Sequence, residues 1–323
     1  MAAVPTDRSR QAQGKGRPLF VYFIKRSFVA LLVAITVSVV SFLLLHVSGD
    51  LAQSLAGPSA SAADVAQVRK AYGLDRPMVI QYLDWAGKAI RGDFGYSFFL
   101  KQPVFPIIAD RLPVTMMLGV SALVIALFVS IPLGIAAALR PNSWIDRLAL
   151  TVSVFGQALP SFWFGLLLMM LFGVTLRWLP VSGTGGWQYY VMPAITLSYY
   201  SIPTFMRLTR AGMMEVLASD YIRTARAKGL RTPTVLFKHA LRNAIIPLVA
   251  VAAVQLGFAL GGSIVIEAVF SLHGVGYLGW ESISRADFPV VQAIVLILAL
   301  FYIVLTLLAD LLNAFLDPRI RVR

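Results

Sequence analysis

Six apolar segments, each long enough to cross a lipid bilayer, constrain the fold of this 323-residue chain more than any other feature. A helix needs about 20 apolar residues to cross a hydrocarbon core of about 30 Å. The chain is 58% hydrophobic and only 13% charged, so we predict an all-α integral membrane protein with six transmembrane helices. The predicted spans are residues 20–47, 112–139, 145–174, 187–206, 243–270 and 289–313.

Lysines and arginines fall unequally on the two sides of the predicted membrane. Of the 28 in the chain, 19 lie in the region up to residue 26, the 140–147 turn, the 207–242 loop and the C-terminal tail. The positive-inside rule therefore predicts that both termini and the 207–242 loop are cytoplasmic. The net charge of +13 is explained by this topology in the plasma membrane, and we expect no nucleic-acid partner.

These limits divide the chain into a short series of regions. We predict a cytoplasmic tail (1–19), a first helix (20–47), an extracytoplasmic loop region (48–111), a membrane core (112–313) and a second cytoplasmic tail (314–323). The first apolar segment is too long for a signal peptide and no clear cleavage site follows it, so we expect it to be retained. The loop region suits a folded cap, because its charges nearly balance and it carries the aromatics Tyr72, Tyr82, Trp85, Phe94, Tyr96, Phe98 and Phe99.

The chain carries no residue pattern for chemistry of its own. It has no cysteine, no G-x-x-x-x-G-K-[ST] phosphate loop, no H-E-x-x-H zinc pattern and no G-x-S-x-G elbow. Apart from charges in the first turns of two segments, the ionisable residues within the spans are His46, Glu267 and Asp310, all near helix ends. Ion-coupled carriers usually need a titrating group near the midplane. We therefore predict no catalytic site, no metal site and no ATP site, and expect a partner to supply energy for any uphill transport.

A basic segment, DYIRTARAKGLRTPTVLFKHALRNAIIP (220–247), separates two of the apolar spans. Asp220 suits a helix N-cap and Gly229 suits a C-cap. Thr232 and Pro233 then suit the N-cap and the first helical position of a second short helix. The positions that recur at spacings of three and four, and so predict an amphipathic helix, are Tyr221, Ile222, Ala225 and Gly229.

Three roles are open for this basic helix when it is taken alone. It can lie on anionic lipid headgroups, or it can only retain the topology. Alternatively, it can dock another protein, since the small residues Ala225, Ala227 and Gly229 allow a foreign backbone to come close.

The segment resembles the cytoplasmic coupling motif of ATP-binding-cassette (ABC) importer permeases, most closely the dipeptide, oligopeptide and nickel permeases. The resemblance rests on DYIRTARAKGL (220–230) and HALRNAIIP (239–247). It extends along the chain through YGLDRPMVIQYLDW (72–85), RGDFGYS (91–97), RLPVT (111–115), ALPSFWFG (158–165) and EAVFSLHGVGYL (267–278).

The resemblance implies a six-span permease subunit of a bacterial inner membrane that works with several partners. These are a second homologous permease, two cytoplasmic ATPases that bind ATP and Mg, and a periplasmic solute-binding protein that docks on the loop region. Peptides are the favoured substrate, and nickel or opine-like solutes are the alternative. Two alternative functions of a different class are an ion-coupled secondary carrier and a structural membrane scaffold.

The resemblance also implies which residues contact the ATPase. In the general motif E-A-A-x-x-x-G, this chain has Arg223 and Thr224 at the first two positions, so no acidic residue there can serve docking. In the later motif, Leu272 and His273 stand where Trp and Pro are commoner. The expected coupling residues are Asp220, Tyr221, Arg223, Thr224, Ala225, Arg226, Ala227, Lys228 and Gly229.

Small and polar residues within the spans are candidates for lining the pathway. Each has an ordinary alternative: glycines allow close helix packing, and tyrosines anchor helices at the membrane interface. The candidates are Ser198, Tyr199, Gln255, Gly261, Ser263 and Glu267.

Overall fold

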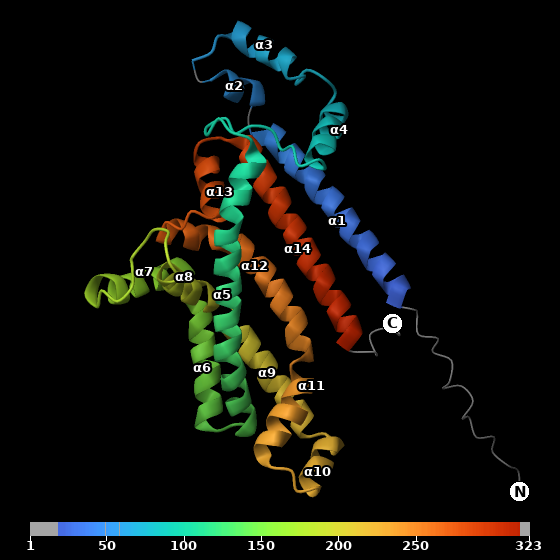
Figure 1. Ribbon diagram of the computed structural model, residues 1–323, viewed down its shortest axis with the longest axis vertical. Coiled ribbons are helices and arrows are strands. Elements are labelled where there is room, and N and C mark those ends of the chain that lie inside the picture. Colours follow the sequence, from blue (N-terminus) through green and yellow to red (C-terminus); the bar gives the residue numbers. More distant parts are fainter. Residues whose placement is uncertain (1–18, 49, 58, 317–323) are drawn as a thin grey trace, which may run out of the picture.

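The computed structural model describes residues 19–48, 50–57 and 59–316, which form helices joined by short turns, with no β-strand among them (Figure 1). The all-α prediction is thus confirmed over these residues, while all the basic residues of the two predicted tails lie outside them. The helices are α1 (Leu19–Ser48), α2 (Leu51–Ala56), α3 (Ala62–Ala71), α4 (Met78–Ala89), α5 (Val104–Leu139), α6 (Trp144–Ala158), α7 (Ser161–Leu168), the π-helix η1 (Met169–Thr175), α8 (Gln188–Ser198), α9 (Ile202–Leu217), α10 (Asp220–Ala227), the π-helix η2 (Thr234–Leu241), α11 (Arg242–Ala244), α12 (Ile246–Phe270), α13 (Val275–Ser284) and α14 (Phe288–Leu316).

Four of these helices, α1, α5, α12 and α14, are long and apolar enough to cross a membrane, among the described residues. They match four of the six predicted spans. Helix α5 begins at Val104 rather than near residue 112. The extra turns are helical because Val104, Ile107 and Ile108 pack with α13 and α14 in one buried cluster.

The third and fourth predicted spans are broken, so the count of six continuous spanning helices is not reached. Pro160 lacks an N–H and restricts the residue before it, and Leu159 is extended with ψ 135° between α6 and α7. The fourth segment breaks at residues 199–201, between α8 and α9. Figure 1 shows α7 turned away from the paired α5 and α6.

Glycine lets the core helices approach closely. A Cβ on Gly134 of α5 would lie 2.8 Å from the carbonyl oxygen of Met206 in α9. A Cβ on Gly257 of α12 would lie 2.3 Å from the ring of Tyr302 in α14. These contacts leave no room for a side chain at either position, as is usual where small residues let membrane helices pack closely.

The segment between α1 and α5 covers one end of the helices and is held there by polar contacts (Figure 1). The carboxylate of Asp287 accepts hydrogen bonds from the Ser97 hydroxyl and from the backbone N–H groups of Phe98 and Phe99. The guanidinium of Arg285 lies 3.6 Å from the centre of the Phe99 ring. The end of the loop region is therefore fixed to the turn between α13 and α14.

Local capping orders the rest of this loop region. Ser61 begins α3 in a capping box with Asp64, in which each side chain bonds to the other's backbone N–H. The Ser61 hydroxyl also donates to the Asp64 carboxylate at 2.7 Å, and these bonds hold the pKa of Asp64 below its usual value.

Candidate functional site

The predicted coupling segment forms the end of the molecule opposite α2, α3 and α4 (Figure 1). Helix α10 spans Asp220–Ala227, close to the predicted helix. The prediction of Asp220 as N-cap was wrong, because Ser219 occupies that position with an extended backbone at ψ 153°. The Ser219 hydroxyl donates to the carbonyl of Val216 at 2.6 Å, so it closes α9 and makes no side-chain cap for α10.

One side of α10 is fixed into the body of the protein. Ile222 is fully buried and Ala225 is 7% exposed. Both belong to a hydrophobic cluster with Met213 of α9 and with Val235 and Ala240 of η2. Burial of this side anchors the helix, and it removes Ala225 from the residues that a foreign backbone can reach.

The other side of α10 is exposed along its length. Arg223, Thr224, Arg226, Ala227 and Lys228 all face solvent. Arg223 pairs with Asp220 at 3.1 Å, but both side chains are largely exposed, so this pair adds little stability. The helix therefore presents basic and small side chains outward on a firmly held base.

Two further contacts shape the ends of this segment. The Tyr221 hydroxyl accepts a hydrogen bond from the Asn243 side chain at 2.8 Å, which joins α10 to α11. Beyond α10, the backbone is already helical at Thr232 and Pro233, so this helix begins one residue earlier than predicted, and it continues as the π-helix η2.

Gly229 ends the segment in a conformation that favours glycine. Its φ is +73°, and its N–H donates to the carbonyl of Arg226 at 2.9 Å. No heavy atom lies within 4 Å of the position where a Cβ would stand, apart from its chain neighbours. Lys228 occupies the C-cap position, so Gly229 lies one residue beyond the predicted cap, and the space next to Gly229 is open.

An ion pair that was not predicted ties α9, which leads into α10, to α6. Arg210 donates from Nε and Nη2 to the two carboxylate oxygens of Asp146 at 2.6 and 2.7 Å. The backbone N–H of Asn142 also donates to this carboxylate at 2.9 Å, and the Asp146 side chain is only 3% exposed. Because the two residues are 64 positions apart, nothing in the local pattern of either one indicates the other.

Most of the predicted pathway residues are engaged within the chain. The hydroxyls of Ser198 and Ser263 are buried and donate to backbone carbonyls in their own helices, each at 2.9 Å. The Tyr199 hydroxyl donates to the carbonyl of Leu159 at 3.3 Å, and its ring stacks on Phe164. These contacts favour packing over solute binding for the three residues.

Glu267 joins three helices and is completely buried. Its carboxylate accepts hydrogen bonds from the Thr115 hydroxyl of α5 and from the Tyr277 N–H of α13, both at 2.8 Å. The Thr115 hydroxyl in turn accepts one from the Val275 N–H at 2.8 Å. Glu267 of α12 therefore caps the start of α13, where the first N–H groups have no partner within the helix.

Gln255 and Gly261 lie in different surroundings on α12. The Gln255 side chain donates to the Ser201 hydroxyl at 3.1 Å, across to the break between α8 and α9. At Gly261 and Gly262, no heavy atom lies within 4 Å of the position that a Cβ would take, apart from chain neighbours, so both glycines face away from the other helices. Of the six pathway candidates, Gly261 alone lies on an outward face in the described structure.

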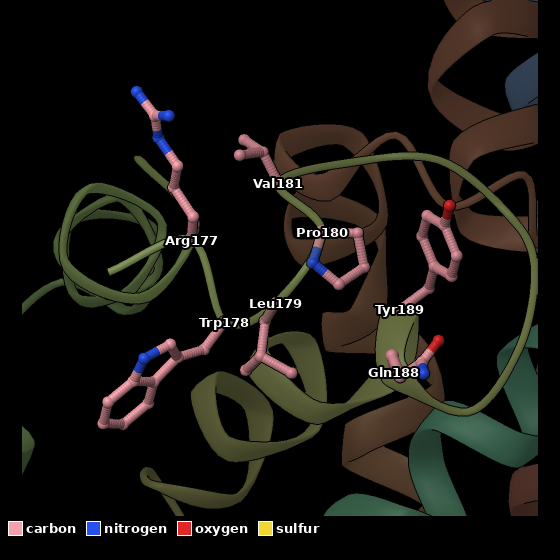
Figure 2. Close-up of a pocket in the computed structure, with 8 residues that line it drawn as sticks. Arg177, Trp178, Leu179, Pro180, Val181, Gln188 and Tyr189 are labelled. Carbon is pink, nitrogen blue, oxygen red and sulfur yellow. The ribbon is translucent and has the colours of Figure 1, made fainter. Parts of the chain in front are cut away.

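A shallow cavity of about 530 Å³ lies elsewhere, between the loop after η1 and the start of α8. Figure 2 shows Arg177, Trp178 and Tyr189 among its lining residues. It includes none of the predicted coupling or pathway residues. Over the described part of the chain, no group of three His, Asp or Glu side chains is placed to hold a metal ion.

Comparison with known proteins identifies close relatives. Residues 130–322 match the family model for the binding-protein-dependent transport system inner membrane component, and residues 19–119 match the N-terminal model of such membrane components. The glutathione transport system permease protein GsiC of Salmonella typhimurium strain LT2 is 41% identical over 303 residues, covering 94% of this chain and 99% of that protein. The Escherichia coli K12 protein of the same name is 42% identical over the same length.

A solved structure shares the fold. The inward-facing MetNI methionine ABC transporter aligns with a TM-score of 0.51 at 15% identity, covering 65% of this chain and 96% of that one. At 15% identity, this match shows only that the two chains share the arrangement of their helices.

Proposed function

The chain belongs to the family of binding-protein-dependent transport system inner membrane components, and from that membership we propose how its parts serve import. It is a permease subunit of an ABC importer and not an enzyme. We propose that it forms half of a translocation pathway that works by alternating access. A second, homologous permease forms the other half, and two ATPases that bind ATP and Mg drive the cycle.

The proposed docking site for an ATPase is the exposed side of α10 together with Gly229. One observation carries this proposal: α10 is anchored through a fully buried Ile222 while its outer side and the space at Gly229 are open. A segment must be held rigidly if movement of a bound protein is to be transmitted into the permease. Movement of α9 would reach α6 through the ion pair between Arg210 and Asp146.

The proposed orientation places α10 in the cytoplasm and the end of the molecule that carries α2, α3 and α4 on the outer side of the inner membrane. The distribution of basic residues supports it. The two regions lie at opposite ends of the helices, as this orientation requires (Figure 1). The outer region would then receive the solute-binding protein.

The proposed interface with the second permease includes the outward face of α12 around Gly261. The absence of a side chain there leaves room either for a partner helix or for a hydrated pathway. Gln255 bridges α12 to the break between α8 and α9, so its hydrogen bond to Ser201 would break or form as these elements move relative to one another.

The proposed substrates are peptides, including glutathione, which the GsiC relatives are named for transporting. Nickel and opine-like solutes remain the alternative, because the binding protein contributes much of the selection. The test is ATP hydrolysis by the reconstituted transporter with its binding protein, measured with glutathione, a dipeptide or Ni²⁺. We expect stimulation by a peptide, and stimulation by Ni²⁺ alone would overturn the peptide proposal.

A further inference from the structure

Helix α4 carries an apolar stripe that no part of the described chain covers. Val79, Leu83 and Ile90 are 69%, 61% and 87% exposed. Their spacings of four and seven residues place them on one side of the helix, and Ile90 still has helical backbone angles. Three large apolar side chains in line on one helix are an interaction surface rather than scattered exposed residues.

A different side of α4 fastens it to α1. The Tyr82 hydroxyl lies 2.8 Å from the Ser38 hydroxyl, and the Tyr82 ring centre lies 5.5 Å from that of Phe42. The Trp85 ring centre lies 5.9 Å from the same phenylalanine, which is only 5% exposed. These contacts fix the position of α4 along the axis of α1.

The contact between α4 and α1 lies within the apolar span of α1. The apolar span of α1 runs from Phe23 to Leu44, so Phe42 and Ser38 both lie inside it. With a rise of about 1.5 Å per residue, Ser38 is about 9 Å from the end of the span at Leu44. Tyr82 and Trp85 are thus at the depth where aromatic side chains gather at a membrane interface.

A second helix gives the same depth. Ser41 donates a 3.4 Å hydrogen bond to the carbonyl of Gln292, which lies four residues inside the apolar span that begins at Phe288 of α14. The level at which α4 touches α1 is therefore inside the apolar spans of two helices.

The charges of α4 suit the same surface. Asp84 and Lys88 are exposed and lie on an arc away from the apolar stripe, and the exposed Arg91 follows the end of the helix. An apolar stripe beside a polar arc with basic residues is typical of a helix that lies at the lipid interface. Long basic side chains at this depth can extend to the headgroup phosphates.

We propose that α4 is an interfacial helix whose Val79–Leu83–Ile90 stripe is covered by lipid acyl chains of the leaflet at this end of the molecule. Figure 1 shows α4 on the side of α1 that faces away from α14. The surface of α1 next to this contact is also apolar and exposed, at Leu31 and Ile35, which lie on the same side of the helix as Ser38 and Phe42. Lipid on that surface of α1 is continuous with lipid on the stripe, and the contact anchors the loop region against the membrane.

The test uses nitroxide labels on single cysteines, since the chain has no native cysteine. Leu83→Cys and Ile90→Cys place the label on the stripe, and Lys88→Cys is the matched control on the polar arc. All three positions are exposed, so the changes leave the packing intact. The assembled transporter is placed in nanodiscs of phosphatidylethanolamine and phosphatidylglycerol, and collisions with oxygen and with water-soluble chromium oxalate are measured.

We expect labels at 83 and 90 to collide severalfold more with oxygen than with chromium oxalate, relative to the label at 88. Equal access to chromium oxalate at all three positions would overturn the proposal, since the stripe would then face water. Protection of 83 and 90 from both reagents would also overturn it, because a protein surface and not lipid would cover the stripe.

Discussion

Removing the carboxylate of Asp146 is expected to destabilise the protein far more than removing an exposed acid. Asp146→Ala leaves the Arg210 guanidinium without the two hydrogen bonds at 2.6 and 2.7 Å and leaves the Asn142 N–H without its acceptor. Loss of one partner from a buried pair costs about 3–5 kcal/mol. Because the Arg210 side chain is 22% exposed and can turn toward water, we expect about 2–3 kcal/mol.

The assay is the free energy of unfolding of the purified protein in mixed micelles, measured by titration with denaturing detergent. Asp84→Ala is the matched control, because Asp84 also pairs with an arginine, at 3.1 Å, but both side chains are more than half exposed. An exposed pair of this kind contributes about 0–1 kcal/mol. We expect Arg210→Ala to cost at least as much as Asp146→Ala, since it leaves the nearly buried Asp146 carboxylate with only the Asn142 N–H as a partner.

A double-mutant cycle separates the pair from its surroundings. The double variant Asp146→Ala with Arg210→Ala is expected to be no less stable than the less stable single variant, because the second change removes a charge that is already unpaired. If Asp146→Ala costs no more than Asp84→Ala, or if the two single costs simply add, the ion pair does not hold α6 to α9.

Three further changes test other parts of the account. Glu267→Ala is expected to lower the free energy of unfolding by about 2–3 kcal/mol, because it leaves the Thr115 hydroxyl and the Tyr277 N–H without their acceptor. Glu267→Gln keeps one acceptor oxygen and should cost less. Equal losses in the two variants would argue against the cap on α13. Gly257→Leu should separate α12 from α14 and lower thermal stability, while Gly261→Leu should leave the stability of the isolated chain unchanged, and the reverse order would contradict the packing. For orientation, Ser59→Cys should react with an impermeant maleimide in intact cells and Thr234→Cys only after lysis; labelling of Thr234→Cys from outside would refute the proposed topology.

Local patterns predicted the parts of the fold that depend on neighbours in sequence. The long apolar runs predicted α1, α12 and α14 closely. Gly229 indicated a helix end because glycine readily adopts a positive φ, which is +73° in the structure. The spacing of Tyr221, Ile222, Ala225 and Gly229 likewise predicted an amphipathic helix, although Ala225 lies on its buried side and not among the residues open to another protein. Each of these features depends on residues that are close together in the chain.

Contacts between distant segments could not be predicted in the same way. Glu267 was a candidate for the pathway near a helix end, but it is buried and its carboxylate accepts a hydrogen bond from Thr115, 152 positions away in the chain. The break at Pro160 was missed because the run from 145 to 174 is apolar on both sides of the proline, and hydropathy does not register a lost N–H. Ser219 replaced Asp220 as N-cap because the end of α9 fixes the backbone there.

The central claim is that α10 and Gly229 couple this permease to an ATPase, and Gly229→Asp tests it most directly. The open space around Gly229 means that the aspartate fits within this chain, with a backbone cost of about 1 kcal/mol for φ above zero. At a close protein contact it should cost about 2 kcal/mol or more, or about thirtyfold in docking. Gly92→Asp is the matched control, with φ of +81°, equally open space and a position in the loop region.

The measurement is substrate-stimulated ATP hydrolysis and uptake by the full transporter in proteoliposomes, at equal amounts of permease. We predict that Gly229→Asp loses both together while Gly92→Asp keeps both, and that Arg223→Ala with Arg226→Ala has the smaller effect. If α10 only binds lipid headgroups, the double arginine variant should be the more damaging, at roughly 1 kcal/mol of membrane attraction per basic residue. Uptake by Gly229→Asp equal to that of the unchanged protein would contradict the assignment of α10 as the coupling helix.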